Sequence, residues 1–146
     1  RRENEKSNVL MEASSTQKGN VYNLLKADPN AIFCTRDSFQ NSFIRASLKD
    51  GKAFILKSYR IKGNNLGYKN LQNWKLEGQK ASNGEWILLD RHSNEQFGKL
   101  EVKTYKVSCG EELKSVKLIQ DEPPVFPNIS ISFNINAFDI FGTLVF

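Results

Sequence analysis

The sequence has 146 residues, of which 39% are hydrophobic and 25% are charged, and this fits one globular domain with a single core. The net charge is +5, but the lysines are scattered among acidic residues, so the composition argues against a nucleic-acid-binding protein. No apolar stretch is long enough to cross a membrane, and two cysteines, Cys34 and Cys109, are too few for a secreted disulfide scaffold.

Short segments of strand-forming residues, separated by turn residues, follow one another along most of the chain. Residues 1–7 are charged and aperiodic, so we expect a linker or frayed end there and one domain over residues 8–146. Residues 21–25 predict one helical turn. Strands are predicted at residues 9–13, 32–35, 43–48, 54–62, 74–79, 86–90, 100–108, 113–120, 129–133 and 137–141.

Hydrophobic alternation is clearest in residues 43–48, where Ile44, Ala46 and Leu48 alternate with polar residues. This period of two is typical of a strand with one face in a core and the other in water. Eight to ten short strands with almost no helix therefore predict an all-β, antiparallel β-sandwich or barrel.

Turn residues suggest how the later strands are connected. Asn83-Gly84 predicts a tight hairpin, because this pair tolerates positive φ at both central positions. We expect residues 100–108 and 113–120 to pair with each other around Cys109-Gly110. Gly142 is expected to end the last strand.

The order of motifs in the centre of the chain suggests a family. A strand from Trp74 to Gly78 is followed by Asn83-Gly84 and a second strand from Trp86 to Leu89, and a closing strand carries Asp139 before Gly142. This arrangement resembles the discoidin, or coagulation-factor type C, domain of the galactose-binding-like sandwiches. The resemblance extends from about residue 8 to residue 144. It implies a jelly-roll sandwich in which both tryptophans anchor the core.

The cysteines bear on the setting of such a domain. Extracellular discoidin domains usually carry one cysteine near each end, joined together, whereas Cys34 and Cys109 do not occupy the ends. The chain therefore looks most like the variants found in intracellular multidomain proteins of protists. We expect two free thiols and a cytoplasmic location, with a disulfide and a secreted protein as the alternatives.

The sequence contains no recognisable catalytic or cofactor motif. Its one histidine, His92, lies in a polar segment that reads as a solvated loop, and no cysteine–histidine spacing suits zinc. A phosphate-binding glycine-rich loop and a Gly-x-Ser-x-Gly elbow are both missing. Some relatives hold a structural calcium, for which Asp28 and Asp139 are the nearest counterparts. We predict no enzyme, no cofactor and no metal.

The resemblance implies that a ligand binds among loops at one rim of the sandwich. Three regions are candidates, at residues 14–30, 35–41 and 91–92. The side chains that we expect to contact the ligand are Asn23, Arg36, Asp37, Tyr68, Arg91 and His92. Each also has a structural explanation, such as a turn cap for Asn23 or a weak surface ion pair for Arg36 with Asp37.

Three functions fit these observations. The first is a non-catalytic recognition module of a larger multidomain protein, which binds a glycan or a protein segment. The second is a carbohydrate-binding module of a secreted hydrolase, and the third is a structural assembly domain. Binding to nucleic acid or membranes is not expected, and the oligomeric state is not indicated. A cleft that holds two carboxylates, or His92 and a carboxylate, would favour an enzyme instead.

Overall fold

The computed structural model describes residues 9–16, 18–25, 30, 33–34, 42–65, 71–121 and 134–145. Over these residues the chain is built from strands and two short 3₁₀ segments, and no helix is long and apolar enough to span a bilayer. In chain order the elements are β1 (Val9–Ala13), β2 (Lys18–Gly19), η1 (Val21–Leu25), β3 (Phe33–Cys34), β4 (Phe43–Leu48), η2 (Lys49–Gly51), β5 (Ala53–Lys62), β6 (Trp74–Lys80), β7 (Trp86–His92), β8 (Val102–Lys106), β9 (Leu113–Gln120) and β10 (Ala137–Val145).

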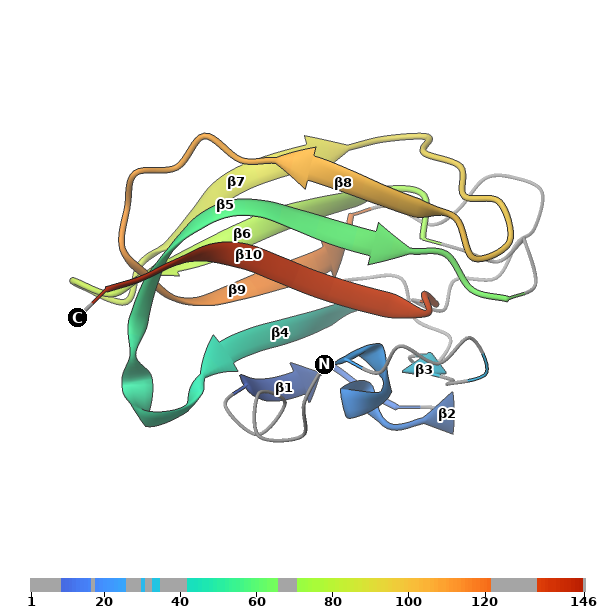
Figure 1. The fold of residues 1–146 in the computed structure, drawn as a ribbon, viewed down its shortest axis with the longest axis horizontal. Coiled ribbons are helices and arrows are strands. Elements are labelled where there is room, and N and C mark those ends of the chain that lie inside the picture. Colours follow the sequence, from blue (N-terminus) through green and yellow to red (C-terminus); the bar gives the residue numbers. More distant parts are fainter. Residues whose placement is uncertain are drawn as a thin grey trace.

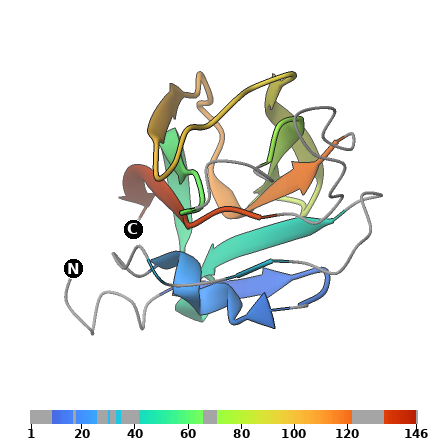
Figure 2. The same cartoon turned by 90° about the vertical axis from the view of Figure 1, so that its right-hand side faces the viewer.

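The prediction of an all-β antiparallel sandwich is confirmed. One layer has the strand order β1-β4-β9-β6-β7, and the other has the order β10-β5-β8. The two layers are continuous at one point, where Phe54 of β5 pairs with Leu113 of β9. Figure 2 shows β10, β5 and β8 on one side of the sandwich and β9, β6 and β7 on the other. Strands β2 and β3 form a separate small pair beside η1 (Figure 1).

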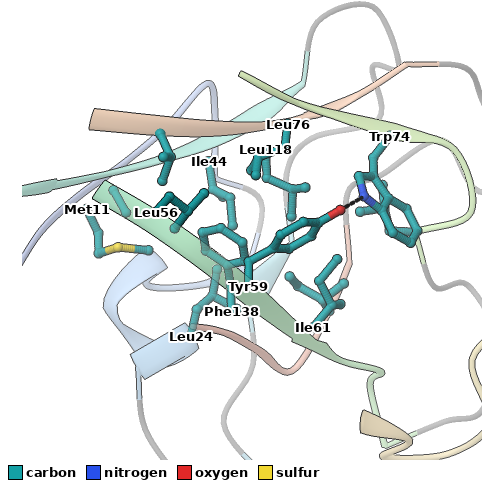
Figure 3. Packing of buried hydrophobic residues seen from close by; sticks show 14 of the residues in the cluster. Met11, Leu24, Ile44, Leu56, Tyr59, Ile61, Trp74, Leu76, Leu118 and Phe138 are labelled. Atoms are coloured by element: carbon teal, nitrogen blue, oxygen red, sulfur yellow. Dashed lines mark hydrogen bonds between the residues drawn. The ribbon is translucent and has the colours of Figure 1, made fainter. Parts of the chain in front are cut away.

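Side-chain alternation builds the core between the layers (Figure 3). In β4, Ile44 and Ala46 are buried while their neighbours face outward, as the period of two predicted. Large side chains from both layers meet there, among them Trp74, Tyr59 and Phe138, each at most 1% exposed. Burial of a side chain of this kind contributes roughly 1.5–3 kcal/mol, so this contact surface is the main source of stability.

The hairpin between β6 and β7 forms where Asn83-Gly84 predicted it. Gly84 has a φ of 75°, and its N–H donates to the carbonyl of Lys80 over 2.9 Å. The pairing then shifts register between Leu76 and Glu77, which leaves Leu89 as an extra residue in β7.

Trp74 and Trp86 do not form the expected pair of core anchors. Trp74 is fully buried, but Trp86 pairs with Gln79 and lies half-buried on the outer face of its layer. The prediction for Trp86 is wrong because strand alternation places Ile87, its neighbour, toward the core instead.

Two predicted connections are also wrong. Strand β8 pairs with β5, whereas β9 pairs with β4 and β6, so residues 107–112 carry the chain between layers and do not close a hairpin. Strand β10 does not end at Gly142 but continues beside β5 to Val145. At Gly142 a Cβ atom would overlap the carbonyl oxygen of Ile55, so glycine is what allows this close approach.

Candidate functional site

One end of the sandwich gathers polar side chains in its interior. Strands β5, β7 and β9 end there, and β4, β6 and β10 begin there (Figure 1, right). Residues flanking these strand ends carry buried amides, at most 7% exposed, and we call them the amide cluster: Asn64, Gln72, Asn73, Gln120 and Asn136. Because buried amides need hydrogen-bond partners, such a cluster fixes the connecting segments that cross it.

The segment between β7 and β8 is held by one side chain of the amide cluster and by the backbone carbonyls of two other members. The N–H of Asn94 donates to the side-chain oxygen of Asn73 over 2.9 Å. The N–H of Glu95 donates to the carbonyl of Gln72 over 3.0 Å, and the N–H of Leu100 to that of Asn64 over 2.9 Å. This connection is therefore held in one shape by the strand ends beneath it.

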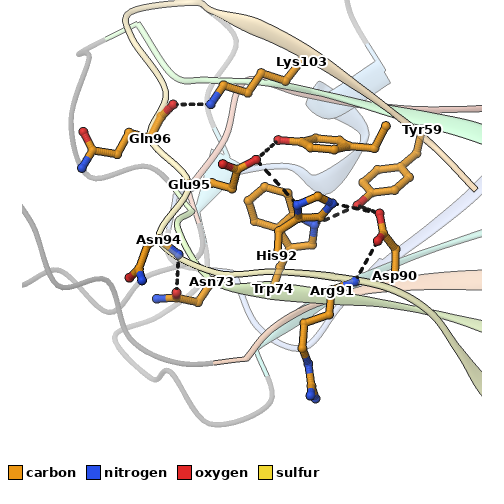
Figure 4. A network of polar contacts seen from close by, with 11 residues as sticks. Tyr59, Asn73, Trp74, Asp90, Arg91, His92, Asn94, Glu95, Gln96 and Lys103 are labelled. Atoms are coloured by element: carbon orange, nitrogen blue, oxygen red, sulfur yellow. Dashed lines mark hydrogen bonds and ion pairs between the residues drawn. The ribbon is translucent and has the colours of Figure 1, made fainter.

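A chain of hydrogen bonds runs from the core to the end of β7 (Figure 4). The indole N–H of Trp74 donates to the Tyr59 hydroxyl over 3.0 Å, and that hydroxyl donates to Oδ2 of Asp90 over 2.8 Å. The same carboxylate oxygen lies 3.0 Å from Nε2 of His92. Asp90 also accepts from the N–H of Arg91 over 3.0 Å. The carboxylate is thus fixed by several donors.

A second carboxylate holds His92 from its other side. Glu95 accepts from the Tyr105 hydroxyl over 2.8 Å, and the same oxygen lies 3.7 Å from Nδ1 of His92. The imidazole packs on aromatic rings, with centroids 4.4 Å from Tyr105 and 5.2 Å from Trp74. We call Asp90, His92 and Glu95 the His92 group. Its side chains are 24%, 28% and 28% exposed, so their edges meet solvent.

Burial raises the pKa of Tyr59 and of Tyr105 well above that of a free phenol, and the neighbouring carboxylates Asp90 and Glu95 raise each pKa further. Both hydroxyls therefore remain protonated donors at physiological pH. The carboxylate oxygens of Asp90 and Glu95 have further lone pairs that can accept from hydroxyl or amide groups of a ligand.

The structure separates the side chains of Arg91 and His92. Arg91 lies on the outer face of its layer, 53% exposed, and its Nε is 3.0 Å from Oδ2 of Asp121. His92 points to the opposite face, between the layers. The expectation that His92 lies in a solvated loop is wrong, because it is the last residue of β7.

Of the other predicted ligand contacts, the structure describes Asn23, which does not join the His92 group. Asn23 belongs to η1, where its N–H donates to the carbonyl of Asn20 over 2.8 Å. Figures 1 and 2 place η1 and the end of β7 on opposite sides of the molecule. Arg36, Asp37 and Tyr68, like Asp28, lie outside the described residues.

Sequence reasoning missed Asp90, Glu95 and Tyr105. The polar residues 90–96, which follow Trp86, could have marked this segment as a candidate site. The sequence does not indicate, however, that tyrosines from β5 and β8 contact its carboxylates. The amide cluster could have been noticed, since each amide lies at the end of a predicted strand or within two residues of it.

A histidine beside two carboxylates meets part of the criterion that would favour an enzyme. Both carboxylates, however, already accept hydrogen bonds from tyrosines, which suits them to holding His92 in place. Among the residues that the structure describes, no three His, Cys, Asp or Glu side chains are grouped so as to hold a metal ion. Cys109 is a free thiol, half-buried after β8.

Comparison with solved structures identifies the architecture. The module CpGH89CBM32-5 of Clostridium perfringens, in complex with GalNAc-β-1,3-galactose, superposes with a TM-score of 0.76 at 14% identity, covering 94% of this chain and 97% of that one. The F5/8 type C domain of a Bacteroides fragilis protein gives 0.75 at 10% identity, covering 96% and 95%. The chain has the galactose-binding-like fold.

A further match within this fold carries a sugar. The family 32 carbohydrate-binding module of NanJ from C. perfringens, in complex with galactose, gives a TM-score of 0.73 at 15% identity, covering 92% of this chain and 94% of that one. No protein-family model and no curated protein matches the sequence significantly. The expected discoidin-type architecture is confirmed.

Proposed function

We propose that this domain is a non-catalytic glycan-binding module whose ligand site lies at the end of the sandwich occupied by the His92 group. The observation that carries the proposal is a histidine fixed between two carboxylates on an aromatic base, with its edge open to solvent. Neighbours with the same fold, in complex with galactose and with GalNAc-β-1,3-galactose, support a sugar as the ligand class.

The geometry suits recognition of hydroxyl groups. A sugar hydroxyl both donates and accepts, and the His92 group offers carboxylate acceptors beside an imidazole nitrogen. Asn94 and Gln96 add exposed amides on the connection held by the amide cluster. Because the side chains of Asp90, His92 and Glu95 are already held in position, their contacts to a ligand cost little conformational entropy.

The non-catalytic part of the proposal rests on how the carboxylates are used. Asp90 accepts a hydrogen bond from the Tyr59 hydroxyl, and Glu95 accepts one from the Tyr105 hydroxyl. The pKa of each tyrosine is raised, so neither tyrosine gives up its proton to the carboxylate. A hydrolase would need one carboxylate free to donate to a leaving group and the other free to activate water.

Titration of the purified domain with galactose and GalNAc-β-1,3-galactose, preceded by a glycan array, tests the proposal. Glu95→Gln removes a charge with little change of shape, and Asn94→Gly removes an exposed amide while keeping the positive φ of 57°. We expect either change to weaken glycan binding about tenfold, which corresponds to the loss of one good hydrogen bond. Ser82→Ala, in the exposed hairpin between β6 and β7, is the matched control.

The opposite result would be a wild-type domain that binds no glycan on the array. A protein partner recovered with the same domain, and lost with Glu95→Gln, would then favour recognition of a protein segment. Unchanged glycan affinity in both variants, with thermal unfolding unaltered, would move the site away from the His92 group.

The cytoplasmic setting remains a prediction. It requires that Cys34 and Cys109 both carry free thiols in the native protein. Mass spectrometry of the protein alkylated without reduction would find two modified cysteines, whereas an unmodified pair would point to a disulfide and a secreted parent.

A further inference from the structure

The outer face of the β4-β9-β6-β7 layer carries an aromatic and cationic surface far from the core. Antiparallel register places Arg45 opposite Lys117, and in the adjacent row it places Ser115 opposite Gln79 and Gln79 opposite Trp86. With Phe43 these residues form what we call the Trp86 face: Phe43, Arg45, Gln79, Trp86, Ser115 and Lys117.

Both cations of the Trp86 face are held against aromatic rings. Nζ of Lys117 lies 4.3 Å from the centre of the Trp86 ring and 4.8 Å from that of Phe43. Cζ of Arg45 lies 5.3 Å from the same Trp86 ring. Such contacts fix the position of a cation without neutralising its charge.

Hydrogen bonds fix the guanidinium further. Nε of Arg45 donates to the hydroxyl of Ser115 over 3.2 Å, and Nη2 donates to Oε1 of Gln79 over 3.1 Å. The side-chain nitrogen of Gln79 donates in turn to the carbonyl of Gly84 over 3.2 Å. Since a guanidinium has five N–H donors, this arrangement orients Arg45 and leaves donors for another acceptor.

Two other arginines of the sandwich form ion pairs with carboxylates, unlike the cations of the Trp86 face. Arg60 pairs with Asp139 and Arg91 with Asp121, each at 3.0 Å. In the described part of the chain, neither Arg45 nor Lys117 forms an ion pair with a carboxylate. Glu12 and Glu77 lie opposite Arg45 and Lys117 in the same row and offset part of the like-charge repulsion, but the cations keep donors that a ligand anion can reach.

We propose that the Trp86 face binds an acidic polysaccharide, whose carboxylate or sulfate groups are held by Arg45 and Lys117. A guanidinium fork and a fixed ammonium suit such oxygens, and Gln79 can meet hydroxyl groups of the same chain. Glu12 and Glu77 flank the two cations in the same row, so a denser polyanion such as nucleic acid would be repelled. This surface is separate from the His92 group.

Titration of the domain with polygalacturonate, heparin and a neutral galactan, each at two salt concentrations, tests the proposal. We expect Arg45→Gln with Lys117→Gln to weaken binding of the acidic chain at least about tenfold, through loss of charge-assisted hydrogen bonds, and to flatten its salt dependence. Lys57→Gln with Lys106→Gln removes the same charge from exposed positions on the other layer and should change affinity less than about twofold.

Several outcomes decide the matter. Equal weakening by both pairs of substitutions would show that only net charge counts and would overturn the proposal. No binding to either acidic chain, or stronger binding to double-stranded DNA in a parallel titration, would overturn it as well. Lys117→Gln alone keeps the contacts of buried Ser115 and serves if the double variant is poorly folded. Galactose affinity should be unchanged in these variants, so failure here and failure of the proposed glycan site are distinguishable. Comparison of polygalacturonate with heparin identifies which anionic group is preferred.

Discussion

Replacement of Tyr59 by phenylalanine should destabilise the domain far more than the same change at Tyr105. The Tyr59 hydroxyl is the acceptor for the indole N–H of Trp74, a residue that is 0% exposed, and it donates to Asp90. Without it the indole donor stays buried and unpaired, which costs about 1–3 kcal/mol. Asp90 loses one donor but keeps its contact to His92 and is 24% exposed, so water repairs part of the loss.

Together, the unpaired indole N–H and the lost donor to Asp90 should lower the free energy of unfolding of Tyr59→Phe by about 2–4 kcal/mol. Tyr105 donates to Glu95, which is 28% exposed and can be solvated again, so Tyr105→Phe should cost about 0.5–1.5 kcal/mol. Urea-induced unfolding at neutral pH measures both values. Equal costs, or a smaller cost for Tyr59→Phe, would refute the idea that this chain of hydrogen bonds ties the core to the His92 group.

Three further results are expected. Gly142→Ala should lower the free energy of unfolding by about 1–3 kcal/mol or more, since the Cβ of the new alanine would overlap a backbone carbonyl of β5. A thermal melt measures this loss. The raised pKa values of Tyr59 and Tyr105 mean that the unfolded chain ionises first, so stability should be complete below about pH 10 and fall above it. Urea titrations at alkaline pH should show that the free energy of unfolding falls less steeply with pH when Tyr59 and Tyr105 are both replaced by phenylalanine. Arg91→Ala should cost less than about 1 kcal/mol, because its pair with Asp121 is exposed; a larger loss would indicate a structural role.

Local pattern was sufficient for most strands. Residues 43–48 form β4 with the predicted bounds, and Asn83-Gly84 gives the predicted hairpin. In both cases the information is local, since it resides in side-chain alternation or in the φ that a turn requires. The short 3₁₀ segment at residues 21–25 was predicted for the same reason.

Long-range pairing was harder to predict. A hairpin between residues 100–108 and 113–120 is the economical interpretation of a short connection, but that connection crosses from one layer to the other. Nothing in its composition indicates the crossing. The closing strand was cut short because Gly142 looks like a breaker, whereas its lack of a Cβ is what lets the strand continue.

The candidate site was predicted only in outline. His92 was selected as a ligand contact, but its partners Asp90 and Glu95 were not, because the tyrosines that fix these carboxylates come from β5 and β8. Which residues share a face also depends on a register shift that sequence does not reveal. The contacts predicted at Arg36, Asp37 and Tyr68 remain predictions.

The extra residue in β7 has a consequence for how this domain can change. Leu88 pairs with Glu77 and faces outward, but after Leu89 is accommodated Asp90 pairs with Leu76 and faces inward. One strand can therefore present Trp86 to one surface and the His92 group to the other. Deletion of Leu89 alone would turn this bulge into regular pairing, with Asp90 still opposite Leu76 and facing inward and Arg91 still facing outward. The bulge is thus a position where this strand can lose one residue without exchanging the residues of its two surfaces.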